Sequence, residues 1–155
     1  MNIHAGERAI INPVRLTTAI ASGAQLDLMN PWPAEMVVNG VEPSRYKTWF
    51  EGQISALVYA PQNGTLRFSH TSYDEFVVVL HGHTILTADG ASPERFTQGE
   101  AFVVPQGFQG TWEFHDEYRE LIVFETRALQ AVMKAWDLSP QVREPSVIDF
   151  RPQQS

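Results

Sequence analysis

GTLRFSHTSYDEFVVVLHG, residues 64–82, joins two apolar stretches through a short polar segment, and similar stretches recur between residues 49 and 126. They are separated by turn sequences such as Asn63-Gly64, Asp89-Gly90 and the segment PQG at 105–107. Tight turns favour these residue types. Evenly spaced short strands with such punctuation predict an all-β sandwich or barrel.

Helices are predicted only near the two ends of the chain. In RALQAVMKAWDL, residues 127–138, apolar side chains recur with helical spacing, which predicts a short amphipathic helix packed on the outside of the barrel. Near the N-terminus, Asn12 and Pro13 are a favourable N-cap and first-turn pair, and Gly23 would end a helix over residues 16–22. The apolar stripe of the C-terminal helix consists of Leu129, Val132, Met133 and Trp136.

Two proline-containing segments flank this core. PWPAEMVVNGVEPSRY, residues 31–46, is predicted to be an extended arm or an edge strand, and REPSVIDFRPQQS, residues 143–155, to begin as a packed strand. We therefore expect one domain in three parts: an N-terminal arm with a short helix (1–45), a barrel core (46–126), and a C-terminal helix and tail packed on the barrel (127–155).

Composition narrows the classes of function. The 155 residues carry a formal net charge of −7 and contain no basic cluster of the kind that follows a phosphate backbone, so nucleic acid is not an expected partner. The absence of cysteine excludes thiolate catalysis and leaves histidine and carboxylate as metal ligands. The sequence shows no signal peptide and no apolar run long enough to span a membrane, which predicts a cytoplasmic protein with no membrane partner.

Two motifs resemble those of the cupin superfamily, whose members are double-stranded β-helix (jelly-roll) barrels. Glu75 and Gly82 match the Glu-x6-Gly of the first motif, and Gly99, Pro105 and Gly107 match the Gly-x5-Pro-x-Gly of the second. The resemblance implies a single all-β cupin barrel with short terminal helices. The phrase PQGFQGTWEF, residues 105–114, is similar to the branch that contains ureidoglycine aminohydrolases and ethanolamine-utilisation cupins.

The resemblance also raises the question of a metal, because metal-loaded cupins take ligands from His-x-His and Glu in the first motif and from His in the second. The second-motif histidine falls here on Gly110, which cannot ligate. Trp112, two residues later on the same strand face, would occupy part of the space that an imidazole would fill.

The position of His70 depends on how the first motif is aligned. It is the second histidine when the spacing is counted back from Glu75 and the first when it is counted from Gly64. A third alignment places Ser69 and Thr71 at the ligand positions and turns His70 away. Each alignment leaves one histidine and one carboxylate at most, whereas catalytic metal sites usually have three protein ligands. The sequence therefore favours a barrel with a reduced or absent metal site. The alternative is a divalent Mn, Fe, Ni or Zn ion bound by His70 and Glu75.

His81 and His83 would share a strand face, as metal-binding pairs often do. They flank Gly82, the expected turn at the end of the first motif, so we expect them outside the deep interior, at the surface or an interface.

Glu75 is the candidate catalytic residue. The alternation Glu75, Val77, Val79 predicts that its carboxyl group faces an apolar interior, where burial without a partner raises the pKa. Such a group is a metal ligand, a general acid or base, or half of a hydrogen-bonded pair with Arg67 or Tyr73.

An aromatic set provides candidates for ligand binding. Trp112, with Tyr73 and Phe68, could line a pocket for a small planar or polar ligand, and Arg67 could pair with a ligand carboxylate. The competing interpretation is that these rings only fill the core. The aromatic set comprises Trp49, Phe68, Phe108, Trp112 and Phe114.

Three functions are consistent with these features. The favoured one is binding of a small polar or carboxylated metabolite in the barrel. The others are a metal-dependent small-molecule enzyme resembling ureidoglycine aminohydrolase, and an accessory interaction protein with a filled barrel. The resemblance implies a homodimer, in which the proline-rich segment 31–43 would pair with a neighbour's sheet edge.

Overall fold

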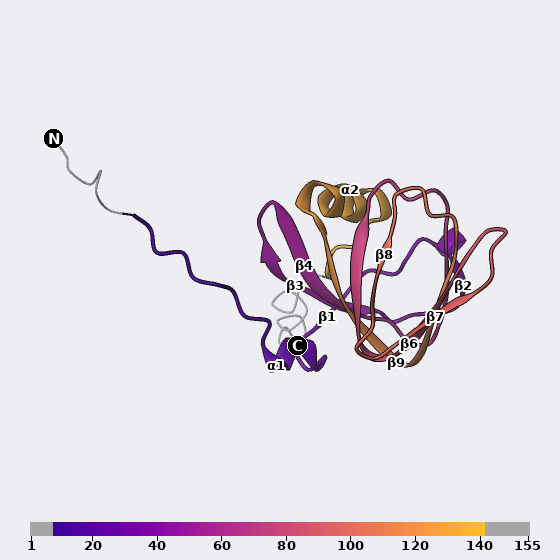
Figure 1. Ribbon diagram of the computed structural model, residues 1–155, viewed down its shortest axis with the longest axis horizontal. Coiled ribbons are helices and arrows are strands. Elements are labelled where there is room, and N and C mark those ends of the chain that lie inside the picture. Colours follow the sequence, from indigo (N-terminus) through magenta and orange to yellow (C-terminus); the bar gives the residue numbers. More distant parts are fainter. Residues whose placement is uncertain (1–7, 142–155) are drawn as a thin grey trace, which may run out of the picture.

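The computed structural model describes residues 8–141, and within them one strongly bent β-sheet forms the body of the molecule (Figure 1). The predicted strand at the start of the C-terminal tail lies outside the described residues. In chain order the elements are α1 (Thr18–Ala21), β1 (Asp27–Leu28), the 3₁₀ helix η2 (Ala34–Met36), β2 (Val37–Gly40), β3 (Arg45–Glu51), β4 (Ile54–Ala60), β5 (Gly64–Phe68), β6 (Glu75–Ala88), β7 (Glu94–Thr97), β8 (Ala101–Val104), β9 (Gly110–Glu125) and α2 (Thr126–Trp136).

The long strands β6 and β9 form the spine of the barrel, and they pair antiparallel along most of their length. On its other edge β6 pairs with β7 and β8, while β9 pairs with β4 and β5, so that the strand order is β1-β3-β4-β9-β5-β2 with β6 bridging to β7 and β8. Antiparallel strands in one curled sheet confirm the predicted all-β barrel fold.

The expected turn at Gly82 is wrong: Gly82 lies inside the continuous strand β6, where the register to β9 shifts on both sides of His81. Gly82 has φ +74°, and a Cβ there would lie 2.5 Å from the carbonyl oxygen of His115. A turn and a bulge of this kind both require glycine, so the sequence alone does not distinguish a turn at Gly82 from a bulge.

The predicted alternation along the core strands is confirmed. Glu75, Val77 and Val79 of β6 are buried, while Phe76 between them is exposed on the outer face. In β9, the buried positions are the even-numbered ones from Gly110 to Phe114 and again from Tyr118 to Phe124. Side chains on the same face of these two strands therefore line one interior.

Helix α2 covers one end of the barrel rather than its outer wall, which corrects the sequence-based placement. In Figure 1 it lies across the end of the barrel between β4 and β8. Its predicted apolar stripe is real, and Leu129, Val132, Met133 and Trp136 all face the cavity that the helix covers. An amphipathic stripe shows that one face is buried, but it does not show which surface buries it.

The structure corrects the predicted N-terminal helix and decides between the two alternatives for the segment that follows it. The helix is only α1, capped by Thr17, whose side-chain oxygen accepts a hydrogen bond from the Ile20 amide, so Asn12 and Pro13 do not begin it. For segment 31–46, which the sequence left open between an arm and an edge strand, residues 37–40 form the edge strand β2, which pairs with β5 of the same sheet. Residues 8–17 instead extend away from the barrel (Figure 1). No helix of the described residues is long and apolar enough to cross a membrane.

Candidate functional site: an acidic, aromatic cavity

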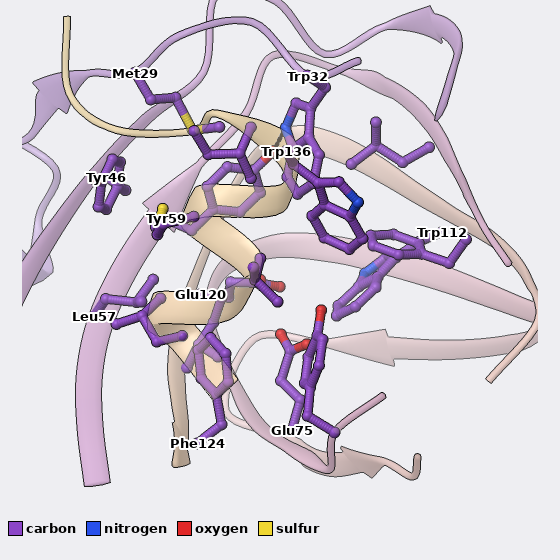
Figure 2. Close-up of a pocket in the computed structure, with 18 of the residues that line it drawn as sticks. Met29, Trp32, Tyr46, Leu57, Tyr59, Glu75, Trp112, Glu120, Phe124 and Trp136 are labelled. Atoms are coloured by element: carbon purple, nitrogen blue, oxygen red, sulfur yellow. Dashed lines mark hydrogen bonds between the residues drawn. The ribbon is translucent and has the colours of Figure 1, made fainter. Parts of the chain in front are cut away.

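A cavity of about 60 Å³ lies inside the barrel under α2 (Figure 2). Engineered apolar cavities of about 150 Å³ bind benzene, so this one has room for a ligand smaller than benzene. Its lining combines aromatic rings and aliphatic side chains with two carboxyl groups. The lining residues are Met29, Trp32, Tyr46, Leu57, Tyr59, Leu66, Phe68, Tyr73, Glu75, Trp112, Phe114, Glu120, Ile122, Phe124, Leu129, Val132, Met133, Trp136 and Leu138.

Glu75 begins β6 and turns its carboxyl group into this cavity (Figure 2). Glu75 is only 8% exposed, and this burial raises the pKa of its carboxyl group to about 8. No hydrogen bond within the described residues 8–141 lowers that pKa. A buried carboxyl group without a protein partner is costly, which marks Glu75 as the polar group in this cavity that most needs a ligand, a proton or water.

Glu120 is the second carboxyl group, and it enters the cavity from β9. Its Oε1 accepts a 2.5 Å hydrogen bond from the hydroxyl of Tyr118. Burial, followed by the neighbouring charge of Glu75, raises the pKa of Glu120 well above its usual value, while the Tyr118 hydrogen bond acts in the opposite direction. Two buried acids that repel each other's charge hold protons more tightly than either would alone.

Aromatic side chains form the wall opposite these acids. Trp32 and Trp136 pack with ring centroids 5.7 Å apart, and Phe68 lies 5.9 Å from Trp136 and 5.7 Å from Trp112. Trp32 is fixed by a 2.8 Å hydrogen bond from its Nε1 to the Tyr59 hydroxyl. The rings meet at angles between 50° and 60° rather than stacking flat.

The structure brings four of the predicted site residues together. Glu75, Tyr73, Phe68 and Trp112 all line the cavity. Trp112 is 3% exposed, and its Nε1 has no hydrogen-bond partner among the described residues.

Two other predicted site residues lie elsewhere. The guanidinium of Arg67 makes two hydrogen bonds of 2.8 and 2.6 Å to the carboxylate of Asp89, at the surface. His70 is exposed at a bend after β5, with φ +58°, and does not line the cavity. Of the aromatic set, Trp49 and Phe108 are also absent from the lining.

Sequence reasoning missed Glu120, Trp32 and Trp136 as members of the site. The signal for Glu120 was present, because it alternates with Ile122 and Phe124 on the inner face of β9. Trp32 and Trp136 lie outside the barrel strands, and only the tertiary fold shows that they meet there.

Comparison with known proteins agrees with this architecture. Residues 49–120 match the family model described as the EutQ-like cupin domain. The barrel therefore has the cupin fold, and residues 49–120 carry the match to a cupin family. The matched range of this cupin covers β4 to the middle of β9 and includes both carboxyl groups of the cavity.

Solved structures similar to this cupin share its fold at low sequence identity. A protein assigned as ethanolamine utilization protein Q from Salmonella typhimurium LT2 is 15% identical, with a TM-score of 0.50 over 66% of this chain and 96% of that one. A protein of unknown function from Pseudomonas syringae pv. tomato str. DC3000 is 15% identical, with a TM-score of 0.58 over 64% of this chain and 44% of that one. The Clostridium difficile EutQ protein is 17% identical, with a TM-score of 0.48 over 62% and 80%. A comparison with curated protein sequences finds no match.

The residues of this cupin do not fit the metal site known from metal-loaded relatives. A Cβ at Gly110 would lie 2.1 Å from the carbonyl oxygen of Thr87, so not even alanine fits where the second-motif histidine would stand. His70 does not reach the cavity, and residues 8–141 contain no group of three or more His, Asp or Glu side chains placed to hold a metal. Within that range, Glu75 is the one ligand candidate of the first motif that faces the interior.

The histidines around Gly82 form a separate cluster. The rings of His83 and His115 stack with centroids 4.8 Å apart, and His83 Nδ1 lies 2.9 Å from the carboxylate of Asp116. His81 Nδ1 lies 3.1 Å from the carbonyl oxygen of Glu117. None of these side chains lines the cavity, which agrees with their expected place outside the deep interior.

Proposed function

We propose that this cupin binds a small polar molecule in the cavity under α2. The supporting observation is Glu75, a carboxyl group that is buried, faces the cavity and has no protein hydrogen bond within the described residues. Ligand sites typically combine apolar walls with a few polar groups that orient the ligand, and this cavity has that composition. The presence of a cavity also favours binding over a purely interaction-based role with a filled barrel.

The ligand class is narrower than the sequence indicated. Arg67, the residue proposed to pair with a ligand carboxylate, is bound to Asp89 at the surface. A carboxylated ligand would instead meet Glu75 and Glu120 without a lining cation to offset their charge. We therefore propose a polar ligand that does not carry a carboxylate.

A second candidate function is acid–base catalysis in the same cavity. The observation that favours it is the pKa of Glu75, which burial raises to about 8, close to the pH at which a general acid or base works best. In that case Glu75 would exchange a proton with the bound substrate, and Glu120 would tune its affinity for that proton.

A thermal-shift screen tests the proposed binding function. Small polar molecules without a carboxylate are added in large excess to the wild type, to Glu75→Gln and to the surface control Glu94→Gln. A ligand of the folded state raises the melting temperature in proportion to the logarithm of its concentration over Kd. We expect shifts in the wild type and Glu94→Gln that are lost in Glu75→Gln. Equal shifts in all three proteins would contradict binding at Glu75.

A further inference from the structure

The charged groups of the cavity are all of one sign. Among the described residues that line it, Glu75 and Glu120 are the only ionisable groups apart from tyrosines, and no Lys, Arg or His faces them. Burial raises the pKa values of the three lining tyrosines, Tyr46, Tyr59 and Tyr73, so these phenols stay neutral. When either carboxyl group ionises, nothing in the lining compensates its charge. An ionised carboxyl group in this cavity would therefore need a cation from outside the lining as its partner.

The aromatic wall supplies a second kind of attraction for the same charge. Figure 2 shows Trp112 and Trp136 on one side of the cavity and Glu75 and Glu120 on the other. The faces of indole rings carry negative potential and attract cations within about 6 Å of the ring centre, most strongly when water is excluded. A ligand between the acids and the indoles would therefore be held by both.

A neutral ligand would use these features less completely. An alcohol could exchange hydrogen bonds with both carboxyl groups, but it carries no positive charge to offset theirs or to be attracted by the indole faces. A cation interacts with all three, and it also offsets the repulsion between the two carboxyl groups. The net charge of −7 on the whole chain favours approach of a cation as well.

From this arrangement we infer that the cavity binds a small organic ammonium ion, with its nitrogen at Glu75 and Glu120 and its alkyl part against Trp112 and Trp136. This inference rests on the proposed binding function and specifies its ligand class. The cavity volume of about 60 Å³ limits the ligand to one smaller than benzene.

Binding of a cation should be coupled to release of protons. The titratable groups that line the cavity are Glu75, Glu120 and three tyrosines, whose phenols remain protonated because burial raises their pKa values: Tyr46, Tyr59 and Tyr73. Because the pKa of Glu75 is raised to about 8, much of it is protonated at neutral pH and must ionise to pair with the ammonium. Affinity should therefore rise as the pH increases toward 8 and then level off.

Isothermal titration calorimetry with three molecules of matched size tests the inference: propylammonium, 1-propanol and propanoate. At about pH 8, we expect propylammonium to bind the wild type at least tenfold more tightly than the other two. Titration in two buffers of different ionisation enthalpy should show proton release. Glu75→Gln should weaken propylammonium binding at least tenfold, whereas the surface control Glu94→Gln should bind like the wild type. Glu120→Gln provides a second cavity variant if Glu75→Gln does not fold.

The outcomes separate this inference from the proposed function. If 1-propanol or propanoate binds as tightly as propylammonium, the ammonium inference is overturned while a small-molecule site at Glu75 stands. If propylammonium binds equally to the wild type and both cavity variants, the attraction is to the acidic surface, which also overturns the inference. If none of the three molecules binds, and the thermal-shift screen is also negative, both proposals fail.

Discussion

The hydroxyl of Tyr118 donates a 2.5 Å hydrogen bond to Glu120 Oε1, and both residues are buried at 1% exposure. They stand two positions apart on β9, so they share one face of the strand. The tyrosine is the protein partner of Glu120, while Glu75 has none within the described residues. The two acids are therefore held differently, and Glu75 is the one free to engage a ligand.

Removing the Tyr118 hydroxyl should destabilise the protein. Tyr118→Phe leaves the buried Glu120 carboxyl without its donor, and an unsatisfied buried polar group costs about 1–3 kcal/mol. Urea unfolding at neutral pH measures the loss. Tyr46→Phe is the matched control. Tyr46 is also buried, but no hydrogen bond contributes to the pKa shift of its hydroxyl group. Equal losses in the two variants would contradict the role of the Tyr118–Glu120 bond.

Stability should fall as the pH rises from about 5 to about 8. The pKa of Glu75 is raised from 4.5 to about 8 on folding, so the folded state holds this proton over a range in which the unfolded state has lost it. Unfolding then releases a proton, and each unit of pH across this window weakens folding by up to about 1.4 kcal/mol for this group. Melting temperatures across the window measure the slope.

Glu75→Gln provides the comparison for this pH dependence. Glutamine cannot ionise, so the variant should lose a large part of the slope and should be more stable than the wild type at about pH 8, because it removes a buried acid. Exposed acids with lowered pKa values, Asp89 and Glu100, change protonation below this window and do not interfere. A wild-type stability that is flat across the window would show that Glu75 is not buried as a lone acid.

The barrel could be predicted because its strands carry strong local signals. Buried and exposed residues alternate at Glu75, Phe76 and Val77, and glycines stand where the backbone must turn or bulge. The same alternation placed Glu75 and Trp112 in the interior. Applied to β9 as well, it would have identified Glu120, since a carboxyl group in phase with Ile122 must also face inward.

The remainder of the site depends on contacts that no local pattern encodes. The stripe on α2 predicted a buried face but not that Trp136 would close the cavity against Trp32, more than a hundred positions earlier in the chain. Likewise, Arg67 was predicted to pair with a ligand carboxylate, whereas its partner is Asp89, a contact that is known only from the fold. Pairing of distant segments is decided by the whole packing arrangement rather than by sequence spacing.

Trp112 should contribute to both stability and binding, whereas Trp136 should matter mainly for binding. Trp112 is 3% exposed and packs against Phe68 and Phe114, so Trp112→Ala should cost about 3–5 kcal/mol. Trp136 is half-buried on α2, and its replacement by alanine should cost less. Chemical denaturation and calorimetry with propylammonium measure the two effects. If Trp136→Ala binds propylammonium as tightly as the wild type, the Trp136 ring is not part of the ligand site.

We expect the protein to form a homodimer through residues 8–17, the segment that extends away from the barrel. Ile10 and Ile11 are 86% and 90% exposed on a stretch that extends away from the barrel (Figure 1), and Phe76 and Val103 form an exposed apolar pair across β6 and β8. Burying both surfaces against a second copy would remove apolar area from water. Light scattering at micromolar concentration should show a dimer. The double change Ile10→Asp with Ile11→Asp should give monomers, and a monomeric wild type would contradict the prediction.

Restoring the missing second-motif histidine should damage the fold rather than create a metal site. A Cβ at Gly110 would stand 2.1 Å from the carbonyl oxygen of Thr87, where β6 and β9 are in register, and relief would require the strands to separate. Gly110→Ala and Gly110→His should therefore both lose more stability than Gly90→Ala, which strains a turn at φ +82° but has open space around it.

Elemental analysis of protein purified without added metal or chelator is expected to find no stoichiometric Mn, Fe, Ni or Zn in the wild type or in Gly110→His. A stoichiometric ion that is lost in Glu75→Gln would contradict this expectation, because such an ion would need further protein ligands beside Glu75, and residues 8–141 place no group of three such side chains together.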